Sequence, residues 1–465
     1  MEYRVEKDLL GELEIPKCRY YGINTARATQ NFNLPAKHAH FDIFHNLALI
    51  KKAAAIANFK TGNLTSEKSN AIIQASDEAM SGMFDIDFVV CSLQGGAGTS
   101  TNMNVNECIA NRAIEILGGQ KGDYEIVHPL NDVNMSQSTN DVFPTALRIA
   151  AIKMVRGLSE ELANLQEALQ IKETQFKDIP KLARTQLMDA LPMRAGQGFG
   201  AYAQAIARDR WRIYKAEERL RHINIGGTAI GTGLNALPKY IFIMTETLQS
   251  LTGLGLARAE SPMDITQNAD VFVEVSGLLK TCAVNLLKIS NDLRLLASGP
   301  SGGIGEIIIP EVQAGSTIMP GKVNPVIPEM VAQVAMKVIA NDHAITTAAS
   351  FGQLELNAFM PIIAESLLES LELLQSAIGI FVQKCIIPLR MNEKNCIRNL
   401  ENSSALAAGL IHHIGYDKAA ILAKKAVLQG TSIRKAAELE NILSPEQLDR
   451  IFALSEITKP GIPGK

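Results

Sequence analysis

Apolar residues recur at alternating spacings of three and four along much of the chain after about residue 140. This is the period of one face of an α-helix. The two clearest stripes are Val275, Leu279, Cys282, Leu286, Ile289, Leu293 and Leu296, and Ile362, Leu367, Leu371, Leu374, Ile378 and Val382. The pattern predicts long helices over about 140–176, 197–223, 263–297 and 361–387. Helices of this length with short connections favour a bundle.

The two ends of the chain have a different pattern. The first 135 residues show shorter apolar segments, more glycine and asparagine, and an extended segment around YYGIN (20–24). After about Arg390 only short helices are predicted, over 404–413, 417–428, 431–440 and 445–454. We therefore predict a mainly all-α protein with three domains. These are a mostly helical N-terminal domain (1–138), a central long-helix bundle (139–390) and a small helical C-terminal domain (391–465).

The charge and composition narrow the possible partners. The formal net charge is −3 and the sequence pI is about 6.3, with no block of like charges that would bind nucleic acid. No run of about 18 apolar residues could span a membrane, and the start is charged where a signal peptide is basic and then apolar. We expect a soluble cytoplasmic protein with neither a nucleic-acid nor a membrane partner.

Neither the cysteines nor the histidines predict a metal site. The six cysteines are scattered, without a CxxC pair, and are expected to be reduced core thiols. His412 and His413 are adjacent, and neighbouring positions on a helix point in different directions.

Four segments rich in hydroxyl, amide and glycine residues interrupt the apolar helices. They are QGGAGTSTNMNVNE (94–107), NMSQSTND (134–141), LARTQLMDA (182–190) and GSTIMPGKVNP (315–325). Each is expected at the edge of an apolar helix. Capping explains any one of them, since Ser138 or Thr139 would cap a helix with Asp141 in its first turn. Because each buried polar group without a partner costs about 1–3 kcal/mol, four such segments together point to a ligand.

These segments do not match nucleotide-binding loops. In GSTIMPGKVNP five residues separate the glycines where a Walker A loop has four, and Val323 follows Lys322 in place of Ser or Thr. The glycines of QGGAGTST lack the GxGxxG spacing, and no strand rich in valine and isoleucine precedes them. Nucleotide hydrolysis and dinucleotide binding are disfavoured.

Neutral donors with one lysine suit a small dianionic substrate. Ser, Thr and Asn side chains and helix N-termini donate to carboxylate oxygens, and Lys322 adds a charge. The same donors stabilise the doubly negative aci-carboxylate that forms when a proton leaves the carbon next to a carboxylate. The sequence thus predicts carbanion chemistry. The general base could be Ser316, Lys322, Asp189 or Glu329, and the sequence does not choose among them. A serine acts as a base only where backbone N–H groups and a cation stabilise its alkoxide.

With EKDLLGELEIP (6–16) and YYGINTARATQNF (20–32), these segments resemble the aspartase/fumarase superfamily over essentially the whole chain. GSTIMPGKVNP is the most specific of the motifs. Its continuation VNPVIPE (323–329) is similar to that of aspartate ammonia-lyases, whereas fumarases of the same fold usually read VNPTQCE. The resemblance implies a homotetramer that pools a core of about twenty helices, with each active site assembled from three subunits. It implies reversible anti elimination of ammonia from L-aspartate to fumarate through an enediolate, without a cofactor.

The resemblance also implies roles for individual residues. Ser316 opens a flexible loop and matches the general base. Lys322 and Asn324 match the residues that hold the α-carboxylate of the substrate, with Thr185 beside them.

A second group matches the other end of the substrate. The positions around the β-carboxylate, where the enediolate charge develops, are Thr99, Ser138, Thr139 and Thr317. Asn140 matches a contact to the departing amino group, a role that Thr99 shares.

Four positions depart from the family pattern. Thr317 stands where a second serine is usual, and its methyl group crowds the loop. Gln186 replaces a histidine that many members pair with a glutamate, here Glu329, so we expect Gln186 only to hydrogen bond. Asp132 replaces a histidine before VNM, and Ser301 replaces an arginine after SGP. The change at Asp132 argues against a secondary anion site there. The change at Ser301 alters how the mobile loop is anchored.

Other functions remain open alternatives at this point. Fumarate hydratase needs the same enediolate stabilisation but adds water, and Pro328 departs from its usual pattern. A lyase for a related amino-dicarboxylate is another. Adenylosuccinate and argininosuccinate lyases usually carry a larger or basic residue at Gly321 or Val323. A structural homologue without activity, as among lens proteins of the superfamily, would not require Ser316 and Lys322.

Overall fold

The computed structural model describes residues 2–465 and is helical over most of its length, which confirms the mainly all-α prediction. It divides into two compact units. Unit 1 comprises Met1–Ser159, Arg212–Thr281 and Lys337–Leu374, and unit 2 comprises Glu160–Trp211, Cys282–Met336 and Gln375–Lys465. The three predicted domains, with boundaries at 138/139 and 390/391, remain a prediction. Within residues 2–465, no helix has both the length and the apolar character needed to cross a membrane.

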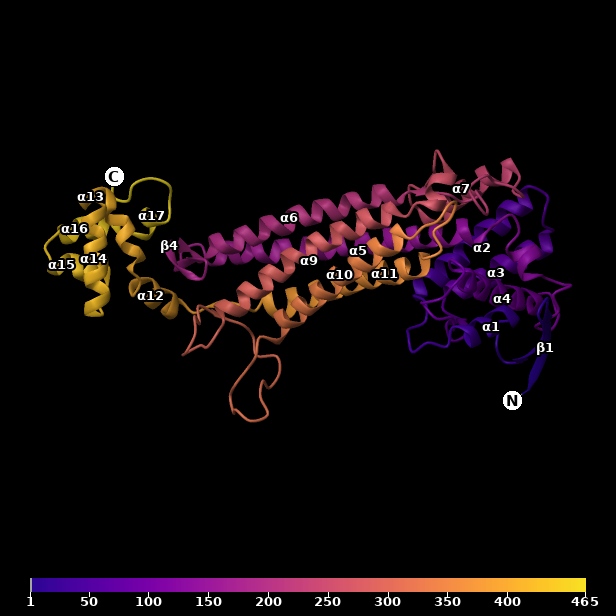
Figure 1. Ribbon diagram of the computed structural model, residues 1–465, viewed down its shortest axis with the longest axis horizontal. Coiled ribbons are helices and arrows are strands. Elements are labelled where there is room, and N and C mark those ends of the chain that lie inside the picture. Colours follow the sequence, from indigo (N-terminus) through magenta and orange to yellow (C-terminus); the bar gives the residue numbers. More distant parts are fainter. Residues whose placement is uncertain (1) are drawn as a thin grey trace. The chain divides into compact units, whose positions relative to one another are not determined.

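Unit 1 starts with an antiparallel hairpin followed by helices (Figure 1). The elements are β1 (Tyr3–Asp8), β2 (Gly11–Pro16), α1 (Ile23–Asn31), α2 (Phe41–Lys60), α3 (Ser66–Met80), η1 (Asp85–Asp87), α4 (Thr99–Ile116) and the π-helix η2 (Pro129–Val133). In the hairpin Tyr3 pairs with Pro16 and Asp8 with Gly11. The expectation that YYGIN (20–24) is extended is wrong at its end, because Ile23 and Asn24 already belong to α1. The buried Glu107 accepts the backbone N–H groups of Gly22 and Thr25 at this helix start.

Five long helices contribute to both units. They are α5 (Thr139–Gln175), α6 (Ala195–Leu220), α9 (Asp270–Leu296), α10 (Val326–Ser350) and α11 (Met360–Phe381). Pro144 is the sixth residue of α5 and lies inside the helix, so it cannot donate to the carbonyl of Asn140. That carbonyl accepts the side-chain amide of Asn224 instead, at 2.9 Å. The predicted helix 263–297 is wrong at its start. The chain leaves the helical conformation at Asn268 (ψ 132°), which separates α8 (Pro262–Gln267) from α9.

The apolar stripes of these helices form their buried faces. All of the first stripe except Leu296, and all of the second except Ile362, are buried. In unit 1, Ser276 and Lys280 of α9 both bond the buried carboxylate of Asp342 on α10. The 3.6-residue period therefore identified the packing faces correctly.

The short elements of unit 1 join these helices. They are β5 (His222–Ile223), α7 (Pro238–Thr252), and β6 (Ala257–Arg258), which pairs in parallel with β5. Because residues 222–223 are extended, α6 ends three residues before the predicted limit of 223.

A carboxylate of α6 makes unit 1 sensitive to acid. Arg156 donates two hydrogen bonds to Glu217, at 2.8 and 2.9 Å, and Arg221 donates another at 2.7 Å. The hydrogen bonds from Arg156, and then those from Arg221, lower the pKa of Glu217 to about 2. Because the folded pKa is depressed, this stabilisation is complete above the unfolded value of about 4.3 and is lost as pH falls toward 2.

We predict that Glu217→Gln makes the stability of the protein decline less steeply between about pH 4.5 and 2. Urea unfolding over this pH range checks the prediction. Glu218→Gln is the control, since Glu218 lies next in sequence and pairs with Lys215 at the surface. Equal slopes for wild type and Glu217→Gln would contradict the assignment.

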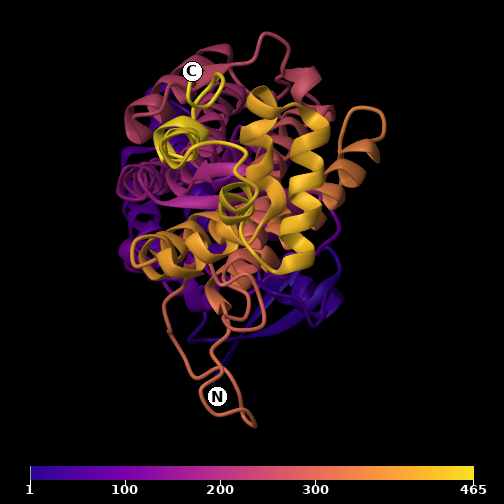
Figure 2. The ribbon, with the colours of Figure 1, turned by 90° about the vertical axis from the view of Figure 1, so that its left-hand side faces the viewer.

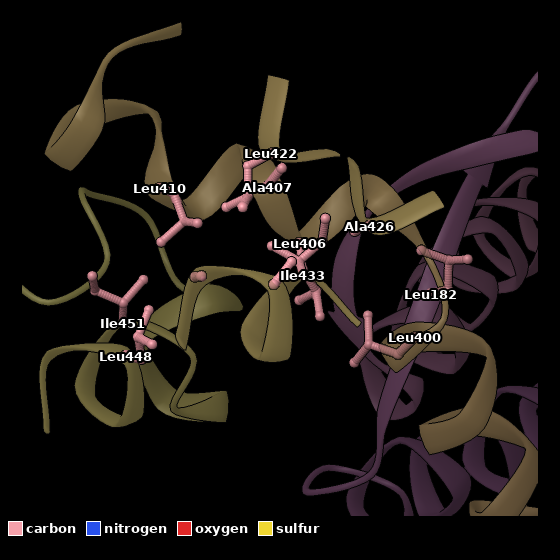
Figure 3. Packing of buried hydrophobic residues seen from close by; sticks show 12 residues of the cluster. Leu182, Leu400, Leu406, Ala407, Leu410, Leu422, Ala426, Ile433, Leu448 and Ile451 are labelled. Carbon is pink, nitrogen blue, oxygen red and sulfur yellow. The ribbon is translucent and has the colours of Figure 1, made fainter. Parts of the chain in front are cut away.

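In unit 2, short helices follow the π-helix η3 (Val382–Ile386) and surround their own core (Figures 2 and 3). They are α12 (Glu393–Glu401), the 3₁₀ helix η4 (Ser404–Leu410), α13 (Ile411–Ile414), α14 (Tyr416–Gln429), α15 (Ile433–Leu439), α16 (Pro445–Ile451) and α17 (Leu454–Ile457). Their buried cluster includes Leu410, Leu422 and Leu448. The sequence predicted the helices that follow residue 403, up to α16, but it missed α12 and α17. It also missed that 404–410 is a 3₁₀ helix.

A hairpin joins this core from the middle of the chain. Strands β3 (Pro180–Thr185) and β4 (Met188–Arg194) pair antiparallel, and Leu182 belongs to the same buried cluster (Figure 3). The expectation that LARTQLMDA lies at a helix edge is therefore wrong. The remaining pair in unit 2 is β7 (Ile307–Ile308) with β8 (Arg390–Met391).

Candidate functional site

The first donor segment forms the start of α4 in unit 1. Three successive residues with positive φ, Gly96 (86°), Ala97 (56°) and Gly98 (94°), bend the chain into the helix. Thr99 is the first helical residue, and its side chain is exposed. The N-cap residue Gly98 has no capping side chain, but Gln94 accepts the backbone N–H of Thr101 on its side-chain oxygen at 3.1 Å. The dipole at a helix start favours an anion.

Gly98 is required by both its conformation and its surroundings. A Cβ atom there would lie 2.4 Å from Cδ2 of Phe143. We predict that Gly98→Ala lowers the free energy of unfolding by roughly 2–4 kcal/mol, combining backbone strain with overpacking. Gly118→Ala is the matched control, because Gly118 has a similar φ (86°) and a Cβ atom there would meet no atom within 4 Å. It should cost about 1 kcal/mol in urea unfolding. Equal costs would contradict the role of Phe143.

The second donor segment forms the start of α5. Ser138 accepts the N–H of Asn140 on its hydroxyl at 3.2 Å, and its own N–H donates to Asp141 at 3.0 Å. Asn140 donates from its side chain to the carbonyl of Ala229 at 2.8 Å. Helix capping thus explains the hydrogen bond of Asp141 and the one accepted by the Ser138 hydroxyl, as expected for this segment from the sequence.

Asn102 of α4 joins these two segments. Its amide donates to the hydroxyl of the buried Thr139 at 3.2 Å and to the side-chain oxygen of Asn134 at 3.1 Å. Unit 1 therefore holds the helix start at Thr99 and the segment carrying Ser138 to Asn140 in one hydrogen-bonded arrangement.

A buried lysine beneath this arrangement was missed from the sequence. Lys51 of α2 is fully buried, and its Nζ donates to the side-chain oxygens of Asn134 (2.9 Å) and Gln137 (3.0 Å). Burial lowers the pKa of Lys51 to about 7, and burial raises the pKa of the nearby Asp141 to about 7. The sequence feature that could have indicated a buried lysine is the lysine pair inside the apolar run LALIKKAAAIA (47–57).

In unit 2, Thr185 and Gln186 occupy the tip of the β3–β4 hairpin. Thr185 pairs with Met188, so Gln186 and Leu187 form a two-residue turn with φ of 55° and 65°. Both conformations are unusual for residues other than glycine, asparagine and aspartate. Thr185 and Gln186 are exposed.

The last donor segment is a loop that closes on itself. Asn324 donates from its side chain to the carbonyl of Gly315 at 2.8 Å. A Cβ on Gly315 would lie 2.2 Å from the carbonyl oxygen of Lys322, so only glycine allows this approach. The closure gathers Ser316, Thr317, Lys322 and Asn324 into one loop preceding α10.

Ser316 has a distinct environment in this loop. Its hydroxyl oxygen accepts the backbone N–H groups of Ile318 at 3.2 Å and Met319 at 2.8 Å. Two N–H donors on one oxygen favour its negatively charged form. This is one of the two conditions that a serine base requires.

The two carboxylate candidates for the base are engaged elsewhere. Asp189 accepts the hydroxyl of Ser403 at 2.7 Å, and Glu329 lies 3.6 Å from Arg294. Asp132 pairs with Lys68 at 2.8 Å, so the position of the usual histidine carries a closed ion pair.

The predicted site residues divide between the units. Unit 1 contains Thr99, Ser138, Thr139 and Asn140, and unit 2 contains Thr185, Gln186, Ser316, Thr317, Lys322 and Asn324. Within residues 2–465, neither a hydrogen bond nor an ion pair links the hairpin tip to the 315–325 loop. In the same residues, no group of three or more His, Cys, Asp or Glu side chains is arranged to hold a metal ion.

Comparison with known proteins decides the family. The profile of a family described as Lyase matches residues 11–340, and that described as Fumarase C C-terminus matches residues 406–459. An aspartate ammonia-lyase from Bacillus sp is 45% identical over 464 residues, covering 100% of this chain and 99% of its own length. The chain belongs to the aspartase/fumarase superfamily of lyases.

Solved structures of this superfamily share the fold. The crystal structure titled fumarate lyase:delta crystallin from Brucella melitensis bound to cobalt has a TM-score of 0.94 and 43% identity, covering 99% of this chain and 100% of that one. Recombinant class II fumarase from Schistosoma mansoni has a TM-score of 0.93 and 35% identity, with the same coverage of 99% and 100%. The aspartase/fumarase fold predicted from the motifs is confirmed.

Proposed function

We propose that this lyase is an aspartate ammonia-lyase, which converts L-aspartate reversibly into fumarate and ammonia. The observation that carries the proposal is the similarity over the whole length to curated aspartate ammonia-lyases, at 40–46% identity. The solved class II fumarase is 35% identical. The VNPVIPE continuation of the 315–325 loop points the same way.

Ser316 is the proposed general base. Its alkoxide is favoured by the N–H groups of Ile318 and Met319, with the charge of Lys322 in the same loop. It takes a proton from C3, and the electron pair moves into the β-carboxylate to form the aci-carboxylate. The pair then forms the C2–C3 double bond as the C2–N bond breaks. The amino group, protonated as in free L-aspartate, leaves as ammonia with the electron pair of the C2–N bond, and the proton on Ser316 passes to solvent.

The donors stabilise the two ends of the substrate. Those proposed for the β-carboxylate, where charge develops, are Thr99, Ser138, Thr139 and Thr317. Those proposed for the α-carboxylate are Thr185, Lys322 and Asn324. Asn140 contacts the amino group, and Gln186 hydrogen bonds in place of the histidine dyad of many relatives.

The proposed assembly is a homotetramer in which three subunits supply each active site. In this arrangement the donor residues of unit 1 and those of unit 2 need not meet within one chain. The proposed reaction uses no organic cofactor, and its proposed setting is the cytoplasm.

The test is to follow the products of purified protein with L-aspartate and, separately, with L-malate. Equal amounts of fumarate and ammonia from L-aspartate, and none from L-malate, are expected. Fumarate from L-malate alone would establish a hydratase instead. Absence of turnover on either substrate would favour a structural homologue. The Ser316→Ala variant controls for contaminating activity.

A further inference from the structure

A buried carboxylate, Glu306, lies against the strand that carries Thr185. Its side chain is wholly inaccessible to solvent. Arg184 donates to both of its oxygens, from Nη2 to Oε1 at 2.8 Å and from Nη1 to Oε2 at 3.1 Å. The Nζ of Lys181 lies 3.3 Å from Oε2. Both cations come from β3, and Arg184 is the residue directly before Thr185.

The other contacts of Glu306 fix it to neighbouring helices. Asn399 of α12 donates to Oε1 at 3.2 Å. The backbone carbonyl of Glu306 accepts the N–H of Asn392 at 2.8 Å, and its own N–H donates to the carbonyl of Leu296 at 2.9 Å. The carboxylate of Glu306 therefore connects β3 to α12, and its backbone connects the same residue to the end of α9 and to the start of α12.

The buried charges of Glu306, Arg184 and Lys181 stabilise one another. Burial raises the pKa of Glu306, but the hydrogen bonds of Arg184 and the charge of Lys181 more than offset it, so the net pKa is lowered. The carboxylate is thus ionised while buried, and each cation is largely shielded from water. Buried charges held this way resist displacement, because moving one leaves the others without a partner.

The hairpin tip needs such an anchor. Gln186 and Leu187 both have positive φ, and bulky residues keep this conformation only where the surrounding structure holds it. A hydrogen bond from Ser403 to Asp189 holds β4, on the far side of the turn. On the Thr185 side, Arg184 and its two bonds to Glu306 are the anchor closest to the tip.

We propose that Glu306 is a positioning residue that fixes the hydroxyl of Thr185 through Arg184. The inference rests on the proposed function, in which Thr185 holds the α-carboxylate of the substrate. Glu306 itself contacts no substrate. Without its carboxylate the tip relaxes, the Thr185 hydroxyl leaves its binding position, and substrate binding weakens more than the chemical step.

A double-mutant cycle tests this with Glu306→Gln, Thr185→Val and the combined variant. Glu306→Gln alone is expected to raise KM for L-aspartate about tenfold and to change kcat less than about threefold. In the Thr185→Val background the same substitution should have almost no further effect on kcat/KM. Equal fold-changes in both backgrounds, or a loss confined to kcat, would overturn the proposal.

Glu107→Gln is the matched control, since Glu107 is also a buried and fully hydrogen-bonded carboxylate but lies in unit 1. Its effect should be the same with and without Thr185→Val. If Glu306→Gln does not fold, Arg184→Lys keeps the charge but loses the paired geometry, and the same cycle applies. Coupling to Thr185→Val supports the proposal and independence rejects it.

Hydrogen exchange gives a readout that does not need turnover. The amides of 181–194 should exchange faster in Glu306→Gln than in wild type, while those of α2 stay unchanged. If the wild-type protein is inactive on L-aspartate, only the proposed function is contradicted. Active wild type with unchanged exchange in the hairpin would defeat only the role of Glu306.

Discussion

Ser316→Ala is expected to lower kcat for deamination of L-aspartate by about 10²–10⁴, the range that a positioned general base supplies. The hydroxyl accepts two backbone N–H groups, at 3.2 and 2.8 Å, and its loop carries Lys322. Alanine removes the oxygen but leaves the closure between Gly315 and Asn324 intact. KM should therefore change little. The ultraviolet absorbance of fumarate gives both constants.

The control is Ser81→Ala, an exposed serine outside the four donor segments. It should keep nearly all of the wild-type kcat. If Ser316→Ala retained more than about a tenth of the wild-type kcat, another group would be the base.

Lys322→Met is expected to lower kcat/KM by about 30- to several-thousand-fold, which corresponds to roughly 2–5 kcal/mol for losing one partner of a desolvated charge pair. Lys322 is the only lysine in the four donor segments, and its side chain is exposed in the single chain. Methionine keeps the length of the side chain without its charge. Because the α-carboxylate binds before and during the reaction, KM should rise along with any fall in kcat.

Lys384→Met, at an exposed lysine of η3, is the control for removing a surface charge. It should leave kcat/KM unchanged. Partial activity of Lys322→Arg, with a raised KM, would agree with a need for charge at this position. An unchanged kcat/KM in Lys322→Met would remove this residue from the site.

Periodicity predicted four of the five long helices, because a buried face forces the same spacing over many turns, but it did not predict α10. The stripe from Val275 to Leu293 is buried as expected. The break at Asn268 left no such signal, because it depends on one extended residue between two helical segments. The hairpin carrying Thr185 was missed for a related reason. Its two-residue turn uses Gln186 and Leu187, and neither is a typical residue for positive φ.

The candidate site was only partly visible in the sequence. The donor segments stood out because hydroxyl and amide residues are rare among apolar helices. Lys51 and Glu306 did not, since each acts through tertiary contacts with residues far away in the chain. A buried charge is recognised only once its partners are known. The motifs therefore predicted the residues proposed to touch the substrate better than those that hold them in place.

The central claim is that donors from different subunits surround one molecule of L-aspartate. Thr99→Val and Ser316→Ala each remove one donor, and each should be nearly inactive alone. When the two variants are unfolded together and refolded in equal amounts, random mixing in a symmetric tetramer should restore both groups to about one site in four. About a quarter of the wild-type turnover of L-aspartate is therefore expected from the mixture. A mixture no more active than the separately refolded variants would contradict it.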